Sequence, residues 1–376
     1  MSEKKNDLFT VGIIAAILLA FAVTDVLYLT GVLSRDPARR TEVHPVATTG
    51  RVLNGQYFEE WDEYALTHFY NQNKWSRLVR DAELFLGRRE FNGILIGKQR
   101  TYFEESLPQD YDEAAAEKSL AFLEKAVQEY DARVMLLPTA DVIWADRLPR
   151  YAEAPDQASY LSKVKERIGE EAYVDLYAVM EEHQKEAVYY RTDPHWTSLG
   201  AYYGYYAWWK QSGRLMPYYY DLGEREIVTE NFVGPLATRA GMEDRGEQIF
   251  VFEETQGKMV TVNYDGRVDR EGFYRPEYLE SGNPYGYFLG DGFGMAKIST
   301  GLDRRTQLVV FGDGNANAMV PLMAPHYATI YLVDLSRWQG DPWSLLSRLE
   351  EDGTDVLILQ SVPGILEAFG LKGVSE

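Results

Sequence analysis

Residues 307–324, QLVVFGDGNANAMVPLMA, hold the clearest fold signal in the chain. Gln307–Phe311 is a short apolar run typical of a buried strand, and residues 315–324 have the composition of a buried helix. The turn Gly312–Gly314 joins them. A tight turn of this kind presents its residues and its backbone N–H groups at the carboxyl end of a parallel strand. The sequence therefore predicts a functional edge at this turn.

The same alternation of strand and helix extends in both directions. Downstream it predicts a strand at 329–333, a helix at 342–350 and a strand at 355–359. Upstream it predicts strands at 91–96, 133–138 and 173–176, and helices at 112–131, 157–168, 177–183 and 198–211. Apolar runs separated by helices are typical of a parallel sheet covered on both faces. We expect a three-layer α/β domain with a parallel sheet and a β-rich insertion at about 213–306.

The N-terminus carries a long apolar segment. Residues 8–32 read LFTVGIIAAILLAFAVTDVLYLTGV, which is long enough to cross a bilayer, and Lys4 and Lys5 precede them. We expect a cytoplasmic tail and single-pass signal-anchor at 1–33, a juxtamembrane linker at 34–55 and an extracytoplasmic domain at 56–376. A cleavable signal peptide is the alternative, because Ala20-Phe21-Ala22 resembles a cleavage site.

Composition excludes several classes of protein. The chain has 376 residues, 45% of them hydrophobic, with a net charge of −20 and no cysteine. Phosphate backbones would repel such an acidic chain, so general nucleic-acid binding is excluded. Without cysteine there are no disulfides, thiolate ligands or cysteine nucleophiles. None of the five histidines pairs with another at metal-ligand spacing, so we expect neither metal nor cofactor. A cysteine-free exported chain is common in Gram-positive bacteria.

One candidate site is the segment Arg191-Thr192-Asp193-Pro194-His195-Trp196-Thr197, just before a predicted helix. In an extended segment, residues two apart project to the same side. Asp193 could then fix the tautomer of His195 and stabilise its charged form, while His195 acts as a general base. Ser198 or Thr197 would cap the helix. The alternative is a helix-entry turn with a structural histidine.

The chain resembles a known family along most of its length. Residues 191–207, RTDPHWTSLGAYYGYYA, look like the signature of the DHHW family, which is similar to the SGNH-hydrolase-like domains of alginate O-acetyltransferases. Further segments agree, among them NGILIGK at 92–98, LLPTADVIWADRLP at 136–149, PYGYFLG at 284–290 and AMVPLMAPHYATIYLVDL at 318–335. The resemblance implies a permuted SGNH-hydrolase-like fold and acyl transfer by a serine, a histidine base and an orienting aspartate.

Mapped by this resemblance, Asp193 is the orienting acid and His195 the base. The nucleophile position is Gly314, and Asn317 aligns with the asparagine of the family's Asp-Ser-x-x-Asn pattern. Arg191, Trp196 and Asn315 complete the expected substrate-binding set. Glycine has no side chain and cannot be a nucleophile, so covalent catalysis is lost, although backbone N–H groups of 314–317 could bind an oxyanion.

Two further departures from the family pattern accompany the missing serine. Pro194 stands in place of the first histidine of Asp-His-His-Trp, and Asp291-Gly292-Phe293-Gly294 stands where relatives carry an Asn-His pair. Two functions stay open. One is an O-acetyltransferase or esterase acting on a cell-surface glycan, beside a membrane-bound O-acyltransferase that the resemblance implies as partner. The other is an inactive glycan-binding or scaffolding protein of a cell-surface assembly.

Overall fold

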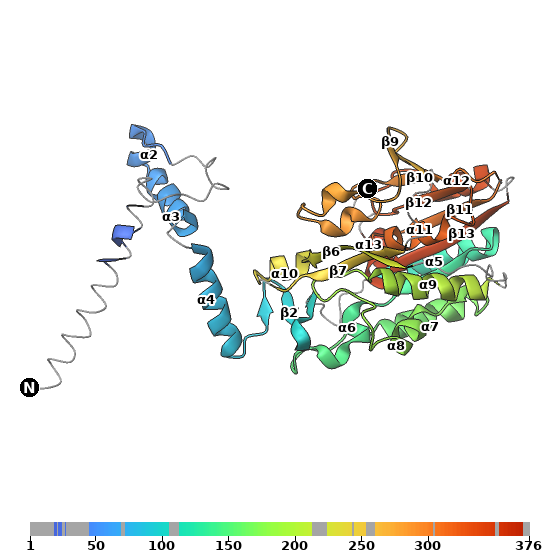
Figure 1. Ribbon diagram of the computed structural model, residues 1–376, viewed down its shortest axis with the longest axis horizontal. Helices are drawn as coiled ribbons and strands as arrows, with labels where there is room; N and C mark the ends of the chain where they lie inside the picture. Colours follow the sequence, from blue (N-terminus) through green and yellow to red (C-terminus); the bar gives the residue numbers. More distant parts are fainter. Residues whose placement is uncertain are drawn as a thin grey trace, which may run out of the picture. The chain divides into compact units, whose positions relative to one another are not determined.

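The computed structural model describes residues 19–20, 22–24, 27, 45–68, 72–104, 113–212, 224–242, 244–252, 260–303, 305–349 and 353–370. The chain divides into two compact units, Met1–Arg88 and Arg89–Glu376 (Figure 1). The first unit contains helices α2 (Thr49–Leu53), α3 (Gln56–His68) and α4 (Gln72–Phe85). Residues 56–88 thus fall in the first unit.

The predicted membrane span at 8–32 lies largely outside the described residues. Among the helices that the structure describes, none combines the length and the apolar character needed to cross a bilayer. The anchor therefore stays a prediction.

An eight-stranded sheet forms the centre of the second unit. Its strand order is β5-β4-β13-β11-β12-β10-β8-β9. The strands span Tyr173–Val174 (β5), Arg133–Leu137 (β4), Thr354–Ser361 (β13), Gln307–Gly312 (β11), Thr329–Val333 (β12), Met295–Ser299 (β10), Thr261–Tyr264 (β8) and Val268–Glu271 (β9). The first five are parallel to one another, whereas β10, β8 and β9 join antiparallel.

The prediction of a parallel sheet was therefore wrong for three of the eight strands. The sheet is mixed, because the segment predicted as an insertion supplies β8, β9 and β10 to its edge. Direct connections join β8 to β9 across a short turn, and such a hairpin can only be antiparallel. The α/β class itself is confirmed.

Helices cover both faces of the sheet and enclose two separate cores. One core contains alternate sheet residues such as Val309 and Phe311 with α5 (Glu113–Tyr130), α7 (Gln157–Ile168), α12 (Pro342–Leu349) and α13 (Val362–Gly370). The other contains Leu308 and Val310 with α6 (Ala140–Ile143), α8 (Leu176–Glu182), α9 (Ser198–Gln211) and α11 (Ala316–Met323). Successive strand residues point to opposite faces of the sheet. Because residues on both faces are buried beneath helices, the domain has three layers.

Shorter elements lie around the sheet. They are the small sheet of β1 (Glu90–Phe91), β2 (Ile94–Ile96) and β3 (Tyr102–Glu104), the ribbon of β6 (Arg225–Phe232) and β7 (Glu247–Phe252), helix α10 (Pro235–Arg239) and the 3₁₀ turns η2 (Lys98–Arg100), η3 (Ala145–Arg147), η5 (Pro276–Tyr278) and η6 (Pro284–Tyr287).

The predicted continuous strand at 91–96 is wrong. Asn92 and Gly93 both have positive φ and form the turn between β1 and β2, as Asn-Gly pairs commonly do.

Candidate functional site

Asp193 and His195 lie in a closed turn that leads into α9. The backbone N–H of Thr197 donates to the carbonyl of Val188 at 2.9 Å, and that of Tyr190 donates to the carbonyl of His195 at 3.2 Å. The Thr197 hydroxyl accepts a hydrogen bond from the N–H of Gly200 and so caps α9, as predicted. These bonds fix the turn from both ends.

The predicted Asp–His relay is present. Oδ1 of Asp193 lies 2.6 Å from Nδ1 of His195 and also accepts the backbone N–H of His195 at 2.9 Å. The Asp193 side chain is 1% exposed and that of His195 is 25% exposed. The bond at Nδ1 directs Nε2 of His195 away from Asp193, which is the orientation that a general base needs.

Glu247 of strand β7 holds the same turn in place through hydrogen bonds. Its carboxylate accepts hydrogen bonds from the backbone N–H groups of Arg191 and Thr192, at 2.8 Å and 3.0 Å. The Thr192 hydroxyl donates to it at 2.7 Å. This carboxylate is 14% exposed, and with three donors it holds the backbone immediately before Asp193. Sequence reasoning missed Glu247, because it lies far from the turn in the chain.

The second half of the site is the turn from β11 to α11. Oδ1 of Asp313 accepts the backbone N–H of Asn315 at 2.9 Å, and Oδ2 accepts the N–H and the hydroxyl of Ser361, both at 2.7 Å. Both oxygens of Asp313 are thus engaged in holding the turn against the end of β13. Its role in this structure is to shape the turn.

Trp196 joins the two halves. Its indole N–H donates to the carbonyl of Asn315 at 2.8 Å, and its backbone N–H donates to Oδ1 of Asn315 at 3.3 Å. Trp196 is fully buried. These bonds connect residues 119 positions apart in the chain, so they set the distance between the His195 turn and the Gly314 turn.

His195 faces Gly314 directly. A Cβ atom built on Gly314 would lie 2.6 Å from Nε2 of His195, closer than such atoms approach in proteins. The φ angle of Gly314 is not in the left-handed region, so its backbone would accept a side chain. The imidazole therefore occupies the space that the first atom of a side chain at position 314 would need.

No hydroxyl replaces the missing nucleophile in the part of the chain that the structure describes. The only hydrogen bonds of His195 side-chain atoms seen there go to Asp193. The Ser198 hydroxyl donates to the carbonyl of Phe250, and the Ser336 hydroxyl donates to Asp334. The serine-type mechanism consequently lacks its attacking atom.

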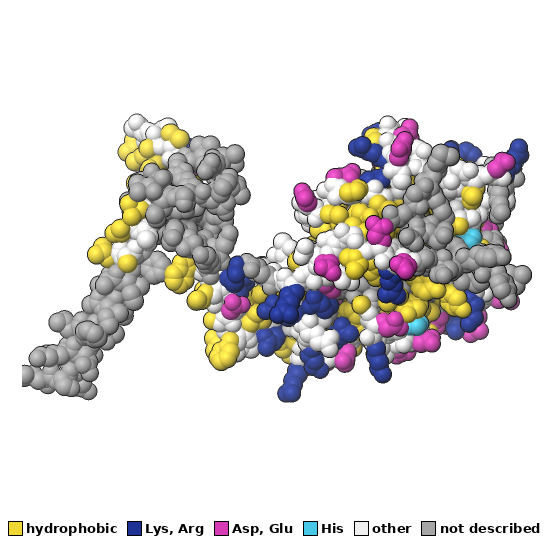
Figure 2. All heavy atoms as spheres, viewed as in Figure 1, with side chains coloured by type: hydrophobic (Ala, Val, Ile, Leu, Met, Phe, Trp, Pro, Cys, Tyr) yellow, Lys and Arg dark blue, Asp and Glu magenta, His cyan; other side chains and the backbone are white. Residues whose placement is uncertain are grey.

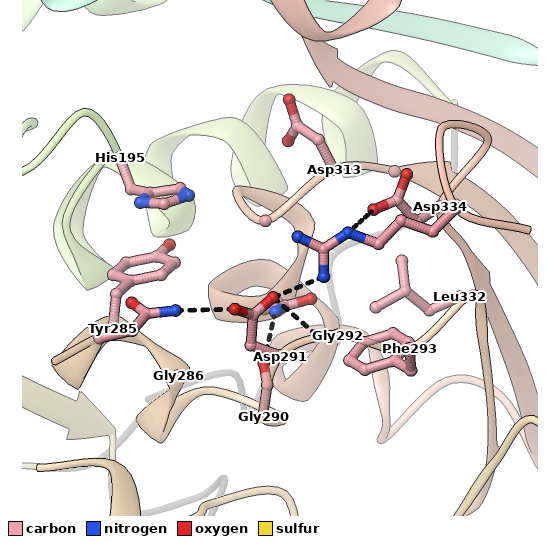
Figure 3. A pocket seen from close by; sticks show the side chains of 15 residues that line it. His195, Tyr285, Gly286, Gly290, Asp291, Gly292, Phe293, Asp313, Leu332 and Asp334 are labelled. Carbon is pink, nitrogen blue, oxygen red and sulfur yellow. Dashed lines mark hydrogen bonds and ion pairs between the residues drawn. The ribbon is translucent and has the colours of Figure 1, made fainter. Parts of the chain in front are cut away.

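The ring of Tyr285 stacks against the imidazole ring of His195. The two rings are stacked with centroids 4.0 Å apart and planes 4° from parallel (Figure 3). Burial opposes charging of the imidazole, but the charge and hydrogen bond of Asp193, with Asp313 and Asp291, outweigh it and raise the pKa of His195. His195 is thus held in place, and its protonated form is more populated than that of a free histidine at the same pH.

A pocket of about 210 Å³ opens beside His195 and Gly314. Its lining includes Asn317 and a charged group on the far wall, in which Arg337 donates to Asp291 at 2.7 Å and lies 3.5 Å from Asp334 (Figure 3). Burial opposes ionisation of Asp291, but the hydrogen bond and charge of Arg337 lower its pKa. The pocket is small and polar, with fixed charges on one wall.

No group of three His, Asp or Glu side chains within the described ranges could hold a metal ion.

A model of the family described as DHHW protein matches residues 102–333, a range that includes both the His195 turn and the Gly314 turn. The chain belongs to the DHHW family. The resemblance seen in the sequence is thereby confirmed. A search of curated proteins finds no match.

Solved structures of similar fold agree with this assignment. A DHHW family protein from Eubacterium siraeum is 23% identical, with a TM-score of 0.60, and the match covers 76% of this chain and 96% of that one. PatB1 from Bacillus cereus, solved with a sulfonyl adduct, is 16% identical, with a TM-score of 0.56 and coverage of 74% and 96%. At these identities the likeness establishes the fold.

The structure brings together some of the DHHW chain's predicted site residues and separates others. Asp193, His195 and Gly314 meet, and Asn317 lines the pocket, where its amide donates to the carbonyl of Gly290 at 3.2 Å. Trp196 and Asn315 are buried behind the pocket wall. The guanidinium of Arg191 points away, toward the carbonyls of Gln99 and Arg100. Substrate binding by these residues stays a prediction.

Tyr285, Arg337 and Asp291 are among the pocket residues that sequence reasoning did not assign to the site. Tyr285 lies in the segment that resembles the family, but nothing in its local pattern indicates that its ring supports a histidine ninety positions earlier. Arg337 follows β12 in an ordinary polar turn. Asp291 was noticed only as a departure from the family pattern, which was the one available signal.

Proposed function

We propose that this protein acts in O-acetylation of a cell-surface polysaccharide as a member that binds acetylated glycan without forming an acyl-enzyme. One observation carries the proposal. Nε2 of His195 faces a glycine whose Cβ position lies 2.6 Å away, and no hydroxyl of the described residues reaches it. A serine nucleophile is missing while the rest of the relay is kept, which leaves binding as the function the geometry supports.

The family of the chain and the shape of the site both support an acetylated ligand. DHHW proteins resemble the SGNH-hydrolase-like domains of alginate O-acetyltransferases, and the relay sits at the carboxyl end of β11, where such a site would bind an acyl group. In its protonated form, which the raised pKa makes more populated, the imidazole of His195 would donate a hydrogen bond to an ester carbonyl or sugar hydroxyl in the pocket. The Arg337 group would fix the orientation of the sugar.

Binding of O-acetylated oligosaccharides to the full chain tests this proposal by calorimetry. We expect the acetylated ligand to bind more tightly than its deacetylated counterpart, and Arg337→Ala to weaken binding. Arg239→Ala is the matched control, since Arg239 is similarly exposed and paired with Glu104 but lies outside the pocket. Equal binding of both ligands, or equal loss in both variants, would count against the proposal.

A second candidate is direct catalysis by His195 as a general base. The intact Asp193–His195 relay at the pocket favours it. In that mechanism Nε2 would take the proton of an acceptor hydroxyl as that hydroxyl attacks the carbonyl carbon of an acetyl ester. The bond from that carbon to the donor's oxygen would then break, and His195 would return the proton to the departing donor alcohol, with no covalent enzyme intermediate. The raised pKa of His195 works against it near neutral pH, because a larger share of the imidazole is already protonated.

Location at the membrane is part of the proposal. Residues 8–32 would form a single-pass anchor with residues 34–376 outside the cell, within reach of a membrane-bound O-acyltransferase as partner. Mass spectrometry of the mature chain separates the anchor from a cleaved signal peptide. A mature N-terminus after Ala22 would show that the segment is a cleaved signal peptide and that the protein is secreted without an anchor. Co-purification with the acyltransferase tests the predicted partner.

A further inference from the structure

Leu289 lies at the start of one wall of the pocket in a strained backbone conformation. Its φ angle is 60°, in the left-handed region that leucine rarely adopts, and the residue is fully buried. The residues after it, Gly290 to Phe293, line the pocket and include Asp291 (Figure 3). Strained residues persist only where their surroundings fix them, and they cluster at binding sites. The contacts that fix Leu289 therefore bear on the position of Asp291.

Two successive hydrogen bonds lead to the carbonyl of Leu289. The hydroxyl of Tyr264, the last residue of β8, donates to that carbonyl at 2.5 Å. The same hydroxyl accepts a hydrogen bond from Nε of Arg275 at 3.1 Å. A guanidinium can only donate, and a phenol has one proton to give, so both bonds have a fixed direction. A cationic donor at Tyr264 also strengthens the bond that its hydroxyl makes to Leu289.

Arg275 is a buried cation that does not line the pocket. Charged side chains of both signs lie on the surface of the second unit (Figure 2), whereas Arg275 is 5% exposed. Its Nη1 donates to the carbonyls of Glu271, Gly272 and Tyr274, at 3.2 Å, 3.1 Å and 2.9 Å. Its Nη2 has no hydrogen-bond partner among the described residues. Because burial of a cation costs free energy, this arrangement indicates that Arg275 does more than stabilise the fold.

Asp265, which directly follows β8, holds the far end of the same pocket segment. Its Oδ1 accepts the backbone N–H groups of Gly294 and Met295 at 3.0 Å and 2.8 Å. Tyr264 and Asp265 thus bond to the two ends of segment 289–294. The pairing of β8 with β10 fixes where these two residues lie. The antiparallel edge of the sheet therefore supports this wall of the pocket.

We propose that Arg275 and Tyr264 act as positioning residues that hold Leu289 in its left-handed conformation. Through Leu289 they place Asp291 in the pocket that it shares with His195. Removal of the Tyr264 hydroxyl would leave a buried carbonyl without its donor and release the strained backbone. The inference rests on the proposed function in taking this pocket as the binding site, but its test needs no ligand.

Other hydrogen bonds hold Asp291 itself. Its carboxylate pairs with Arg337 at 2.7 Å and accepts from the amide of Asn283 at 3.0 Å, and its backbone N–H donates to the Tyr278 hydroxyl at 3.3 Å. All three bonds act on Asp291 directly. We expect that they do not keep it in place once the bond to the Leu289 carbonyl is lost.

An NMR titration of His195 in the full chain reports where Asp291 lies. Burial lowers the pKa of His195, whereas the nearby charges of Asp193, Asp313 and Asp291 raise it. The signal is identified by its absence in His195→Gln. We expect Tyr264→Phe, which removes only the hydroxyl, to lower this pKa, with at least about a twofold fall in the proton affinity of the imidazole.

Tyr327→Phe is the matched control. Tyr327 is 2% exposed, and its hydroxyl also donates at 2.5 Å, to Asp355, but neither residue lines the pocket. Loss of this hydroxyl should cost stability and leave the pKa of His195 unchanged. Arg275→Gln should lower that pKa as Tyr264→Phe does, and the Tyr264 variant decides the outcome if Arg275→Gln does not fold.

An unchanged or higher pKa of His195 in Tyr264→Phe would overturn the proposal, because the bond would then serve stability alone. An equally large fall in Tyr327→Phe would overturn it as well, since it would show a general loosening of the fold. In the Asp291→Asn background we expect Tyr264→Phe to cause no further fall. A fall of the same size there would contradict the proposal, because the effect would not pass through Asp291. Since no ligand is involved, failure of this inference is distinguishable from failure of glycan binding.

Discussion

Nε2 of His195 lies 2.6 Å from the point that a Cβ atom of residue 314 would occupy. The imidazole is held there by Asp193 at one edge and by the stacked ring of Tyr285. In a working serine site the nucleophile's oxygen would stand between histidine and backbone. Here the ring has only the glycine backbone before it, so any side chain at 314 must displace it.

Substitution of Gly314 should therefore distinguish an inert side chain from a hydrogen-bonding one. We expect Gly314→Ala to lower the free energy of unfolding by about 1–3 kcal/mol, because the methyl group overpacks against His195. Gly314→Ser should lose less stability, since once the ring has shifted its hydroxyl can donate to Nε2 of the neutral imidazole or accept from Nε2 of the protonated one. Urea denaturation of both variants checks this. An alanine variant as stable as the unmodified chain would show that the space is open.

Glu247 should be a positioning residue for the Asp193 turn. Glu247→Ala leaves two backbone N–H groups and the Thr192 hydroxyl without their acceptor, and we expect a loss of about 2–3 kcal/mol in the free energy of unfolding. Glu230→Ala, an exposed glutamate on the same ribbon, should change it by less than about 0.5 kcal/mol. Equal losses would contradict the role of Glu247, and denaturant titration measures both.

The raised pKa of His195 predicts a specific pH dependence. A folded pKa above the unfolded value means that proton uptake stabilises the fold. That contribution is complete below the unfolded pKa, near 6.5, and is lost as pH rises through the folded pKa. The stability of the unmodified protein relative to His195→Gln should thus fall from acidic to alkaline pH. Asp193→Asn should flatten this difference, and a difference that rises with pH would contradict the assignment.

Asp313 should contribute to the stability of the fold more than to the chemistry of His195. Asp313→Ala removes the acceptor for the N–H groups of Asn315 and Ser361, and we expect a loss of about 2–3 kcal/mol in the free energy of unfolding. Calorimetric unfolding measures it. If Asp313→Ala kept full stability but changed the pKa of His195 in an NMR titration, the main role of Asp313 would be electrostatic.

Local pattern was sufficient for some features of the fold and the site. The strand, turn and helix around Gly314 were predicted closely, because a run of four apolar residues and a Gly turn specify them without distant contacts. The Asp193–His195 bond was predictable for the same reason, since the two residues are separated by only Pro194. The turn at Asn92-Gly93 was missed although its signal was present in the sequence.

Other features depend on contacts between distant segments. The antiparallel edge of the sheet arises because β10 pairs with β12 and β8, which no local periodicity encodes. Glu247, Tyr285 and Arg337 reach the site from separate elements, and their neighbours in sequence carry no pattern that indicates it. The approach of His195 to Gly314 depends on Trp196 and Asn315, whose pairing only the folded chain reveals.

The most direct test of a relay without a nucleophile is turnover of an activated acetyl ester by the full chain, measured beside Gly314→Ser and Gly314→Ser with His195→Ala. We predict no turnover by the unmodified protein, a gain in Gly314→Ser, and loss of that gain when His195 is also replaced. Turnover by the unmodified protein that His195→Ala abolishes would contradict the account, because it would show that the site performs chemistry with Gly314 in place.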